Sequence, residues 1–110
     1  MTLKKIISGG QTGADQGALV AGRQLGIPTG GWMPRGFLTE AGPCPPLGEM
    51  YGMQEHPSPA YPPRTRQNVK DADGTLWIGG GEIGDDRGLT CTWNAAERYN
   101  RPFLKDPDTQ

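Results

Sequence analysis

A glycine-rich stretch near the N-terminus carries the residue types best suited to binding chemistry. It reads Ser8-Gly9-Gly10-Gln11-Thr12-Gly13-Ala14-Asp15, follows a short apolar run and leads into a helical pattern. Glycines let a ligand approach the backbone closely, and the first N–H groups of a helix lack intrahelical acceptors and attract anions. The stretch therefore predicts a loop that binds phosphate or another oxyanion. It is not a P-loop, because no Lys-Ser/Thr pair follows the glycines, and its spacing is not G-x-G-x-x-G.

The same residues also predict how the helix begins. Thr12 is expected to cap it, and Asp15, three residues later, to complete a variant capping box. Caps satisfy only some of the free N–H groups, so the remaining ones stay available to a ligand. The side chain of Gln11 is expected to be optional for such binding.

A second glycine stretch, 79–81, follows the apolar run 75–78 and precedes a helix predicted to begin near Gly88. Its acidic residues, Glu82, Asp85 and Asp86, would repel a phosphate. They suit hydroxyl groups, amino groups or a hydrated magnesium ion, although a solvated loop tip is the simpler interpretation. Of the two loops, the first is therefore the one predicted to hold an anion.

Four polar or aromatic residues are candidates for contacts to the rest of a ligand. Arg64 and Asn68 share one face of a predicted helix because they lie four residues apart, and the planar guanidinium of Arg64 suits a phosphate. Arg64 could instead join a surface network with Asp71. Trp32 could stack on a flat ring or belong to the core, and Arg35 could contact a ligand from the following loop or remain solvated.

Composition bounds the class of protein. At 110 residues the chain predicts one domain, and a net charge of −1 excludes the basic field typical of proteins that bind nucleic acid or anionic membranes. The apolar runs are shorter than a membrane span, and no signal-peptide pattern opens the chain, so a cytoplasmic protein is expected. Cys44, Cys91 and His56 have no metal-like spacing. No tightly bound metal is expected, and no catalytic Ser-His-Asp or Cys-His set can be assembled.

The elements that position these residues alternate between strands and helices. Apolar runs predict strands at 3–7, 27–32, 75–78 and 102–104, and periodicity predicts helices at 14–25, 64–72 and from about residue 88. The first helix shows a stripe of Ala14, Ala18, Ala21 and Leu25. This alternation predicts an α/β, Rossmann-like three-layer fold with a parallel sheet of about four short strands and a ligand site at their carboxyl ends. Residues 1–104 form the predicted domain, with 33–63 as a proline-rich, lid-like loop and 105–110 as a polar tail.

Three linked motifs carry a family resemblance. They are Ile6 to Asp15, Gly30-Gly31-Trp32-Met33-Pro34-Arg35-Gly36, and Arg64-Thr65-x-x-Asn68-Val69-x-Asp71-x-Asp73-Gly74-Thr75-Leu76. With them the chain resembles the putative molybdenum carrier family of the SLOG superfamily from about residue 4 to residue 104. The resemblance implies a Rossmann-like fold, a homo-oligomer, either dimer or tetramer, and a pocket for molybdenum cofactor, a pterin that carries a phosphate. Wider relatives bind nucleotides or cleave nucleoside monophosphates.

Residue 94 is an asparagine, and the resemblance implies that the related hydrolases have a catalytic glutamate at this position. Because the glycine loop offers a phosphate site without a catalytic base, the leading interpretation is a non-catalytic binding or carrier protein for a phosphate-bearing heterocycle, most like a molybdenum cofactor carrier. One alternative is a protein that binds or sequesters a nucleotide or a nucleotide-derived signal. The other is a nucleoside-monophosphate phosphoribohydrolase-like enzyme that uses Arg64 and one acid from Glu40, Asp71, Asp85 or Asp86.

The residues predicted to contact the ligand come from both glycine loops, the lid and the helix between them. They are Gly9, Gly10, Gln11, Thr12, Gly13, Ala14, Trp32, Arg35, Arg64, Asn68, Gly79, Gly80, Gly88 and Thr90.

Overall fold

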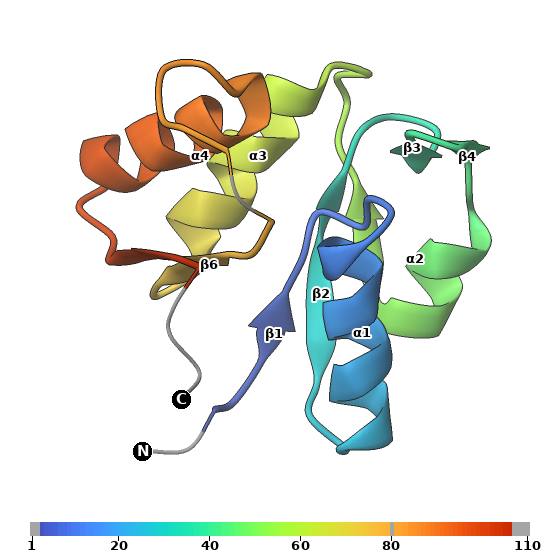
Figure 1. Ribbon diagram of the computed structural model, residues 1–110. Coiled ribbons are helices and arrows are strands. Elements are labelled where there is room, and N and C mark those ends of the chain that lie inside the picture. The colour runs from blue at the N-terminus through green and yellow to red at the C-terminus, as the bar shows by residue number, and fades with distance from the viewer. Residues whose placement is uncertain (1–2, 80, 107–110) are drawn as a thin grey trace.

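The chain begins with a short strand that runs straight into the first glycine loop and its helix, as the sequence predicts (Figure 1). The structure is a computed structural model that describes residues 3–79 and 81–106. Its elements, in order, are β1 (Ile6–Ile7), α1 (Ala14–Gln24), β2 (Thr29–Met33), β3 (Leu38–Thr39), β4 (Gly42–Pro43), α2 (Pro46–Tyr51), β5 (Met53–Glu55), α3 (Tyr61–Asp71), β6 (Thr75–Trp77), α4 (Arg87–Arg98) and β7 (Phe103–Lys105).

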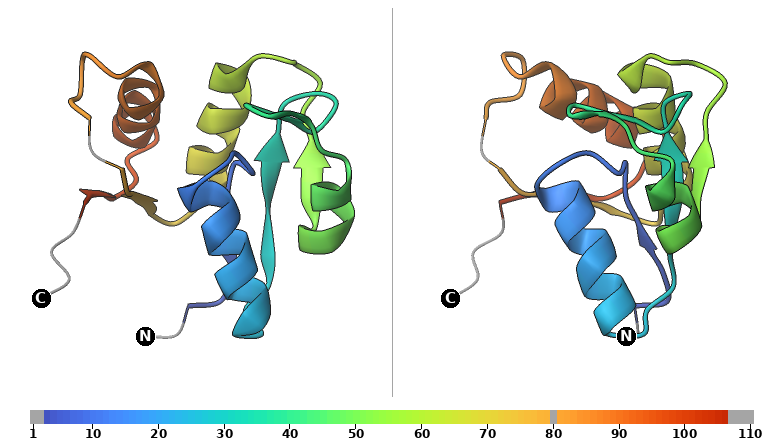
Figure 2. Two further views of the ribbon diagram at one scale, coloured as in Figure 1. Left: turned by 45° about the vertical axis from the view of Figure 1, so that its right-hand side comes forward. Right: turned by 90° about the vertical axis from the view of Figure 1, so that its right-hand side faces the viewer.

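The parallel strands fall into two groups. β1, β2 and β5 pair in that order, and β6 pairs with β7, all in parallel. Figure 2 shows the two groups standing apart, with α3 and α4 on one side of the molecule and α1 near β1 and β2. The α/β, Rossmann-like class is confirmed, but a single four-stranded sheet is not what forms. The larger group has three strands, and no described strand joins β1 to β6.

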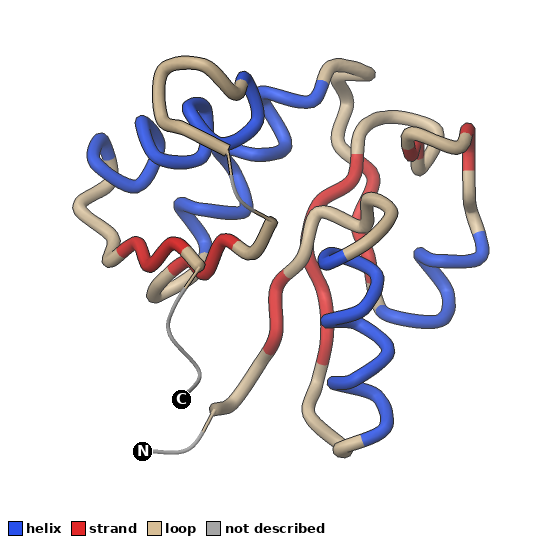
Figure 3. The backbone as a smooth tube through the Cα atoms, in the orientation of Figure 1, coloured by secondary structure: helices blue, strands red, loops and turns tan. Residues whose placement is uncertain are grey.

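The proline-rich segment is more regular than predicted. Residues 33–63 were expected to be loop-like, yet they contain the hairpin of β3 and β4, the helix α2, and β5, which pairs with β2 (Figure 3). Prolines do not prevent α2, because Pro45 and Pro46 lie at its start, where a missing N–H costs nothing. Gly52 ends it with a positive φ of 68°.

The first helix differs from prediction at its start and on its buried face. Gly13, with a φ of 84°, occupies the cap position of α1 and no side chain caps the helix, so the predicted capping box is wrong. The hydroxyl of Thr12 instead donates to Glu40. The buried residues are Leu19 and Gly22 rather than the alanine stripe, because Gly22 lets α1 approach Ile6 and Thr29.

Two small cores hold the elements together. Leu19, Met33, Leu47 and Met53 form the one beneath α1 and α2, and Val69, Ala95 and Ala96 form the one between α3 and α4. Asp86 caps α4 by accepting a hydrogen bond from the Leu89 N–H at 2.8 Å. This acid therefore has a structural function that its sequence position alone did not indicate.

Asn68 ties the two parts of the fold together. Its side-chain oxygen accepts from the Trp32 N–H at 2.7 Å, and its amide nitrogen donates to the Trp32 carbonyl at 3.0 Å. The side chain thus replaces a neighbouring strand for one residue of β2, and it fixes α3 against the sheet.

Replacing Asn68 by alanine should destabilise the fold. Asn68→Ala leaves both backbone groups of Trp32 without their partners, and we expect a loss of about 1–2 kcal/mol in the free energy of unfolding, because the site is only part-buried. Gln67→Ala, which removes one exposed hydrogen bond to Asp71, is the control and should cost less than about 0.5 kcal/mol. Urea unfolding of both variants measures this, and equal losses would contradict the bridging function.

Candidate ligand-binding cleft

A cleft of about 800 Å³ lies between the two groups of strands. β1 and β6 form its sides, α3 contributes Arg64, Asn68 and Val69, and the starts of α1 and α4 reach it at Ala14 and Gly88. The carboxyl ends of β1 and β6 lead into Gly9 and Gly79, which both line it. We call the part lined by Gly9, Arg64, Gly79 and Gly88 the anion end of the cleft.

The guanidinium of Arg64 occupies the space beside Gly9. A Cβ at residue 9 would overlap Nη1 of Arg64, so the missing side chain of Gly9 makes room for this arginine. The Nε atom of Arg64 is buried and has no hydrogen-bond partner. Burial lowers the pKa of Arg64, although the nearby Asp15 partly opposes that shift. An arginine remains protonated even so, and the anion end therefore holds a half-buried positive charge whose Nε donor is unused.

Asp15 lies beside this arginine but is engaged elsewhere. Its carboxylate accepts from the Gln11 N–H at 3.2 Å, and no ion pair joins it to Arg64 among the described residues. Burial raises the pKa of Asp15, while the hydrogen bond from Gln11 and the charge of Arg64 lower it to a smaller extent. Asp15 therefore compensates Arg64 only in part.

Gln11 fixes the shape of the glycine loop. Its side chain donates to the carbonyls of Gly9 and Leu38 and accepts from the Glu40 N–H, at 3.3, 3.0 and 3.1 Å respectively. The side chain thus has a structural function in the loop, whereas the expectation that it is optional for ligand binding stays a prediction. Gly10 is equally constrained, because a Cβ there would stand 2.7 Å from the sulfur of Met33.

The backbone of the loop leaves donors unused. The N–H groups of residues 12–15 donate no hydrogen bond within the described part of the chain, as expected at the start of a helix without a cap. The macrodipole of α1 adds partial positive charge at this point. The loop thus presents a second set of donors close to Arg64.

The cleft brings together most, but not all, of the predicted ligand contacts. Those that line it are Gly9, Gln11, Thr12, Ala14, Arg64, Asn68, Gly79 and Gly88. Those that do not are Gly10, Gly13, Trp32, Arg35 and Thr90, and Gly80 lies outside the described residues.

The aromatic candidate is held away from the cleft. The indole N–H of Trp32 donates to Asp71 at 3.0 Å, and its ring meets His56 edge-on at 5.9 Å between centroids. Asp71 also accepts from Gln67. A surface network at Asp71 was one interpretation of the sequence, and it exists, but its members are Trp32 and Gln67 instead of Arg64. Arg35 is exposed on the loop that follows β2.

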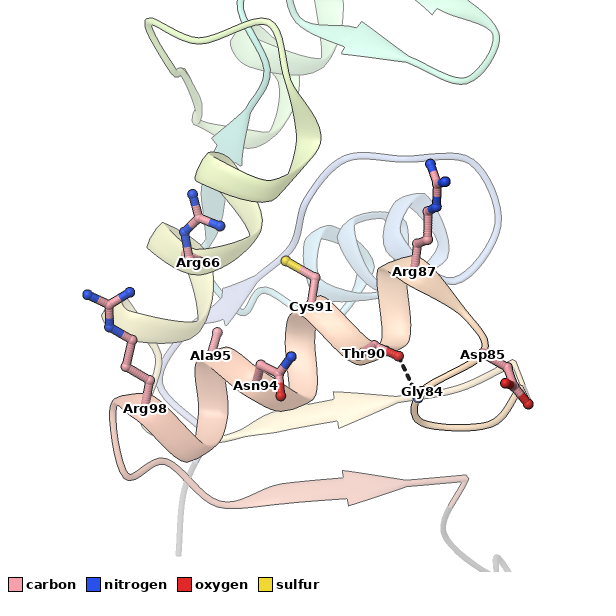
Figure 4. A pocket seen from close by; sticks show the side chains of 9 residues that line it. All are labelled: Arg66, Gly84, Asp85, Arg87, Thr90, Cys91, Asn94, Ala95 and Arg98. Atoms are coloured by element: carbon pink, nitrogen blue, oxygen red, sulfur yellow. Dashed lines mark hydrogen bonds between the residues drawn. The ribbon is translucent and has the colours of Figure 1, made fainter.

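A second hollow, of about 480 Å³, lies on the outer side of α3 and α4 (Figure 4). Arg66, Arg87 and Arg98 surround it, and Asp85 and Asn94 line it too. Thr90 also belongs here, where its hydroxyl accepts from the Gly84 N–H at 2.7 Å. Asn94 is therefore in this hollow and outside the cleft.

Ser8 is a functional candidate that sequence reasoning missed. It is buried in the cleft wall, donates to the Asp15 carbonyl at 2.9 Å and accepts from the Gly10 N–H at 3.2 Å. A serine just before two glycines was the available signal, since its hydroxyl can bond to nearby backbone. Ser8 joins the glycine loop to the first turn of α1.

Comparison with known proteins agrees with this geometry. Residues 6–106 match the model of the circularly permutated YpsA SLOG family. The chain belongs to this family. It is also 47% identical to a putative molybdenum carrier protein from Syntrophus aciditrophicus, whose crystal structure it matches with a TM-score of 0.83 over 94% of this chain and 62% of that one. No curated protein matches it significantly.

This SLOG family chain thus spans less than two thirds of the length of that carrier protein. The resemblance seen in the three sequence motifs is confirmed. In residues 3–79 and 81–106, no helix is both long and apolar enough to cross a membrane, and no group of three His, Cys, Asp or Glu side chains is arranged to hold a metal ion.

The half-buried carboxyl of Asp15 predicts a pH dependence of stability. Because its folded-state pKa lies above the ordinary value of 3.8, this group favours folding most at low pH, and that contribution is lost as the pH rises through the folded-state pKa. Asp15→Asn keeps a side-chain oxygen for the Gln11 N–H but cannot ionise. We expect this variant to gain stability relative to the wild type between pH 4 and pH 7.5, measured by urea unfolding.

Glu49→Gln, at an exposed position on α2, is the matched control and should show no such trend. A difference between Asp15→Asn and the wild type that stays constant across this range would contradict the assignment of a raised pKa to Asp15.

Proposed function

We propose that this protein binds a phosphate-bearing heterocycle in the cleft and acts as a non-catalytic carrier. The observation that supports the proposal most directly is the buried Nε of Arg64, which has no partner. A phosphate would supply the acceptor that this donor lacks, and its charge would compensate a guanidinium that Asp15 compensates only in part. The free N–H groups at the start of α1 would bind the remaining oxygens.

Molybdenum cofactor is the first ligand to consider. A structural relative at 47% identity is named a putative molybdenum carrier protein, and the cofactor's pterin carries the phosphate that the anion end suits. Because the described residues offer no three-ligand metal site, the contacts proposed here are to the phosphate and the ring. A nucleotide has the same two features and remains the alternative ligand. We further propose that the carrier works in the cytoplasm as a homo-oligomer.

An enzymatic function is the second candidate, and Glu40 is the residue that favours it. Of the four acids considered from the sequence, Glu40 lines the cleft together with Arg64, whereas Asp71, Asp85 and Asp86 do not. Its carboxylate accepts from the Thr12 hydroxyl at 3.0 Å and is exposed. A nucleoside-monophosphate phosphoribohydrolase would have to use this acid.

Two independent variants test the proposed contact between Arg64 and the phosphate. Gly9→Ala should displace the guanidinium while keeping its charge, and Arg64→Ala removes it. The loss of charge-assisted hydrogen bonds predicts that both weaken AMP binding about 10- to 100-fold. Isothermal titration calorimetry measures this, with circular dichroism to check folding.

Arg66→Ala is the matched control for these titrations. Arg66 lies two residues further along α3 and lines the outer hollow (Figure 4). If Arg66→Ala weakens binding and Gly9→Ala does not, the phosphate binds in the outer hollow and the proposed site is wrong.

The nature of the ligand and the absence of turnover are tested separately. Native mass spectrometry of protein purified without added ligand should show a mass that corresponds to a phosphate-bearing pterin. Incubation of the protein with AMP should release no adenine, and Glu40→Gln should leave AMP affinity within about threefold, since the carrier needs no acid there. Adenine release that Glu40→Gln abolishes would replace the carrier function by the enzymatic one.

A further inference from the structure

The charges around the glycine loop do not match a phosphate as they stand. Four charged side chains line the cleft, those of Lys5, Asp15, Glu40 and Arg64. The ammonium of Lys5 lies beside Gly30 of β2, so two carboxylates and one guanidinium remain near the loop. A phosphate monoester adds almost two negative charges at neutral pH. Because like charges at short range repel strongly outside bulk water, one of these groups has to lose its charge when the phosphate binds.

Asp15 is the acid that a phosphate at Arg64 would meet. A Cβ built on Gly9 would overlap Nη1 of Arg64 and would stand 3.0 Å from Oδ2 of Asp15, so both groups border the same small space. Charge-assisted hydrogen bonds to a phosphate oxygen are about 2.8 Å long, and an oxygen held by Arg64 in this space is therefore within reach of Asp15.

An ionised carboxylate and an ionised phosphate cannot bond to each other directly. Both are hydrogen-bond acceptors without a donor, whereas a protonated carboxyl has one O–H to donate. No described residue forms an ion pair with Asp15 that would hold it in the ionised form. A proton on Asp15 would remove the repulsion and supply the missing donor.

The second acid, Glu40, is less suited to hold this proton. Its carboxylate is exposed, and it accepts from the Thr12 hydroxyl at 3.0 Å, so water and this donor stabilise its charge. The carboxyl of Asp15 is half-buried, and within the described chain its one donor is the Gln11 N–H at 3.2 Å. Burial raises the pKa of Asp15, and the charge of Glu40 adds to that effect.

We propose that the phosphate binds together with one proton, which is taken from the solvent and held on Asp15. This inference rests on the proposed binding of a phosphate at Arg64. The free protein with an ionised Asp15, a phosphate dianion and one proton give a complex in which the O–H of Asp15 donates to the phosphate. The only bond that forms covalently is this O–H bond. Affinity therefore falls as the pH rises, and Asp15 makes the site sensitive to pH.

The remaining titratable groups near the site come from three elements. Tyr61 of α3 and Cys91 of α4 interact with the charge of Arg64, and Glu40, between β3 and β4, interacts with both Arg64 and Asp15. Phenol and thiol groups mostly keep their protons near neutral pH, and a guanidinium remains protonated. This leaves the two carboxyls as the groups that could take up a proton, and their variants distinguish them.

Isothermal titration calorimetry with AMP counts the protons. The protein is titrated at pH 7.5 in buffers that differ in their heat of ionisation, and the slope of the observed heat against that quantity gives the number of protons taken up. We expect about 0.5–1 proton per AMP bound, and between pH 7 and pH 8 an affinity that falls about three- to tenfold, as linkage requires.

Two variants identify the group that holds the proton. Asp15→Asn keeps an N–H donor for the phosphate but cannot titrate, so its affinity should stay constant between pH 7 and pH 8 and its uptake should fall below about 0.2 proton. Glu40→Gln is the matched control and should retain the uptake of the wild type. The phosphorus NMR shift of bound AMP should be that of the dianion, because the proton is on the protein.

Three results would overturn the proposal. They are AMP binding without proton uptake in the wild type, uptake that Glu40→Gln abolishes and Asp15→Asn retains, and a phosphorus shift typical of the monoanion, which would place the proton on the phosphate. Each of these results leaves the phosphate site itself in place. Failure of the wild type to bind AMP at any pH would overturn the phosphate site and this inference together, so the two failures are distinguishable.

Discussion

The half-buried guanidinium of Arg64 beside the first glycine loop is the constraint on which the rest of the site depends. Moving an arginine out of water is costly unless its charge and donors are matched. Arg64 is matched only in part, because Asp15 bonds to the Gln11 N–H and the Nε of the arginine has no acceptor. Hydrogen bonds of the glycine loop and of α3 hold this arrangement in place. The cleft therefore presents a positive charge that is already positioned for an anion.

Each element around the cleft contributes to holding that guanidinium in place. Gly9 supplies the space, and Gln11 fixes the loop by bonding to Gly9, Leu38 and Glu40. Asn68, one helical turn after Arg64, anchors α3 to β2 through both backbone groups of Trp32. The side chains of Gln11 and Asn68 are thus held by hydrogen bonds to the backbone. Among the described residues, the Nε of Arg64 and the N–H groups of residues 12–15 stay available to a ligand.

The sequence predicts the local elements better than their assembly. The glycine loop, α1, α3 and the β6 strand follow from apolar periodicity and turn residues, and the α/β class follows from their alternation. The capping box does not form because both of its members bond elsewhere. The Thr12 hydroxyl donates to Glu40, which is distant in sequence, and the Asp15 carboxylate accepts from the Gln11 N–H in the same loop. Prolines suggested a loop where α2 forms, since two of them happen to fall in positions that a helix start tolerates. The role of Gly9 could be predicted only in part. The sequence indicates that something approaches its backbone closely, but not that this is the side chain of Arg64 on α3, 55 residues later.

The Nε–H of Arg64 is the most direct probe of the central claim. In a nitrogen–proton correlation spectrum, this buried group should give a distinct signal, assigned by its disappearance in Arg64→Lys, because the other arginine Nε groups can reach solvent or protein acceptors. Titration with AMP should shift that signal, and titration with adenosine, which has the same ring and no phosphate, should not. A complex with AMP that leaves the Arg64 signal in place would contradict the account.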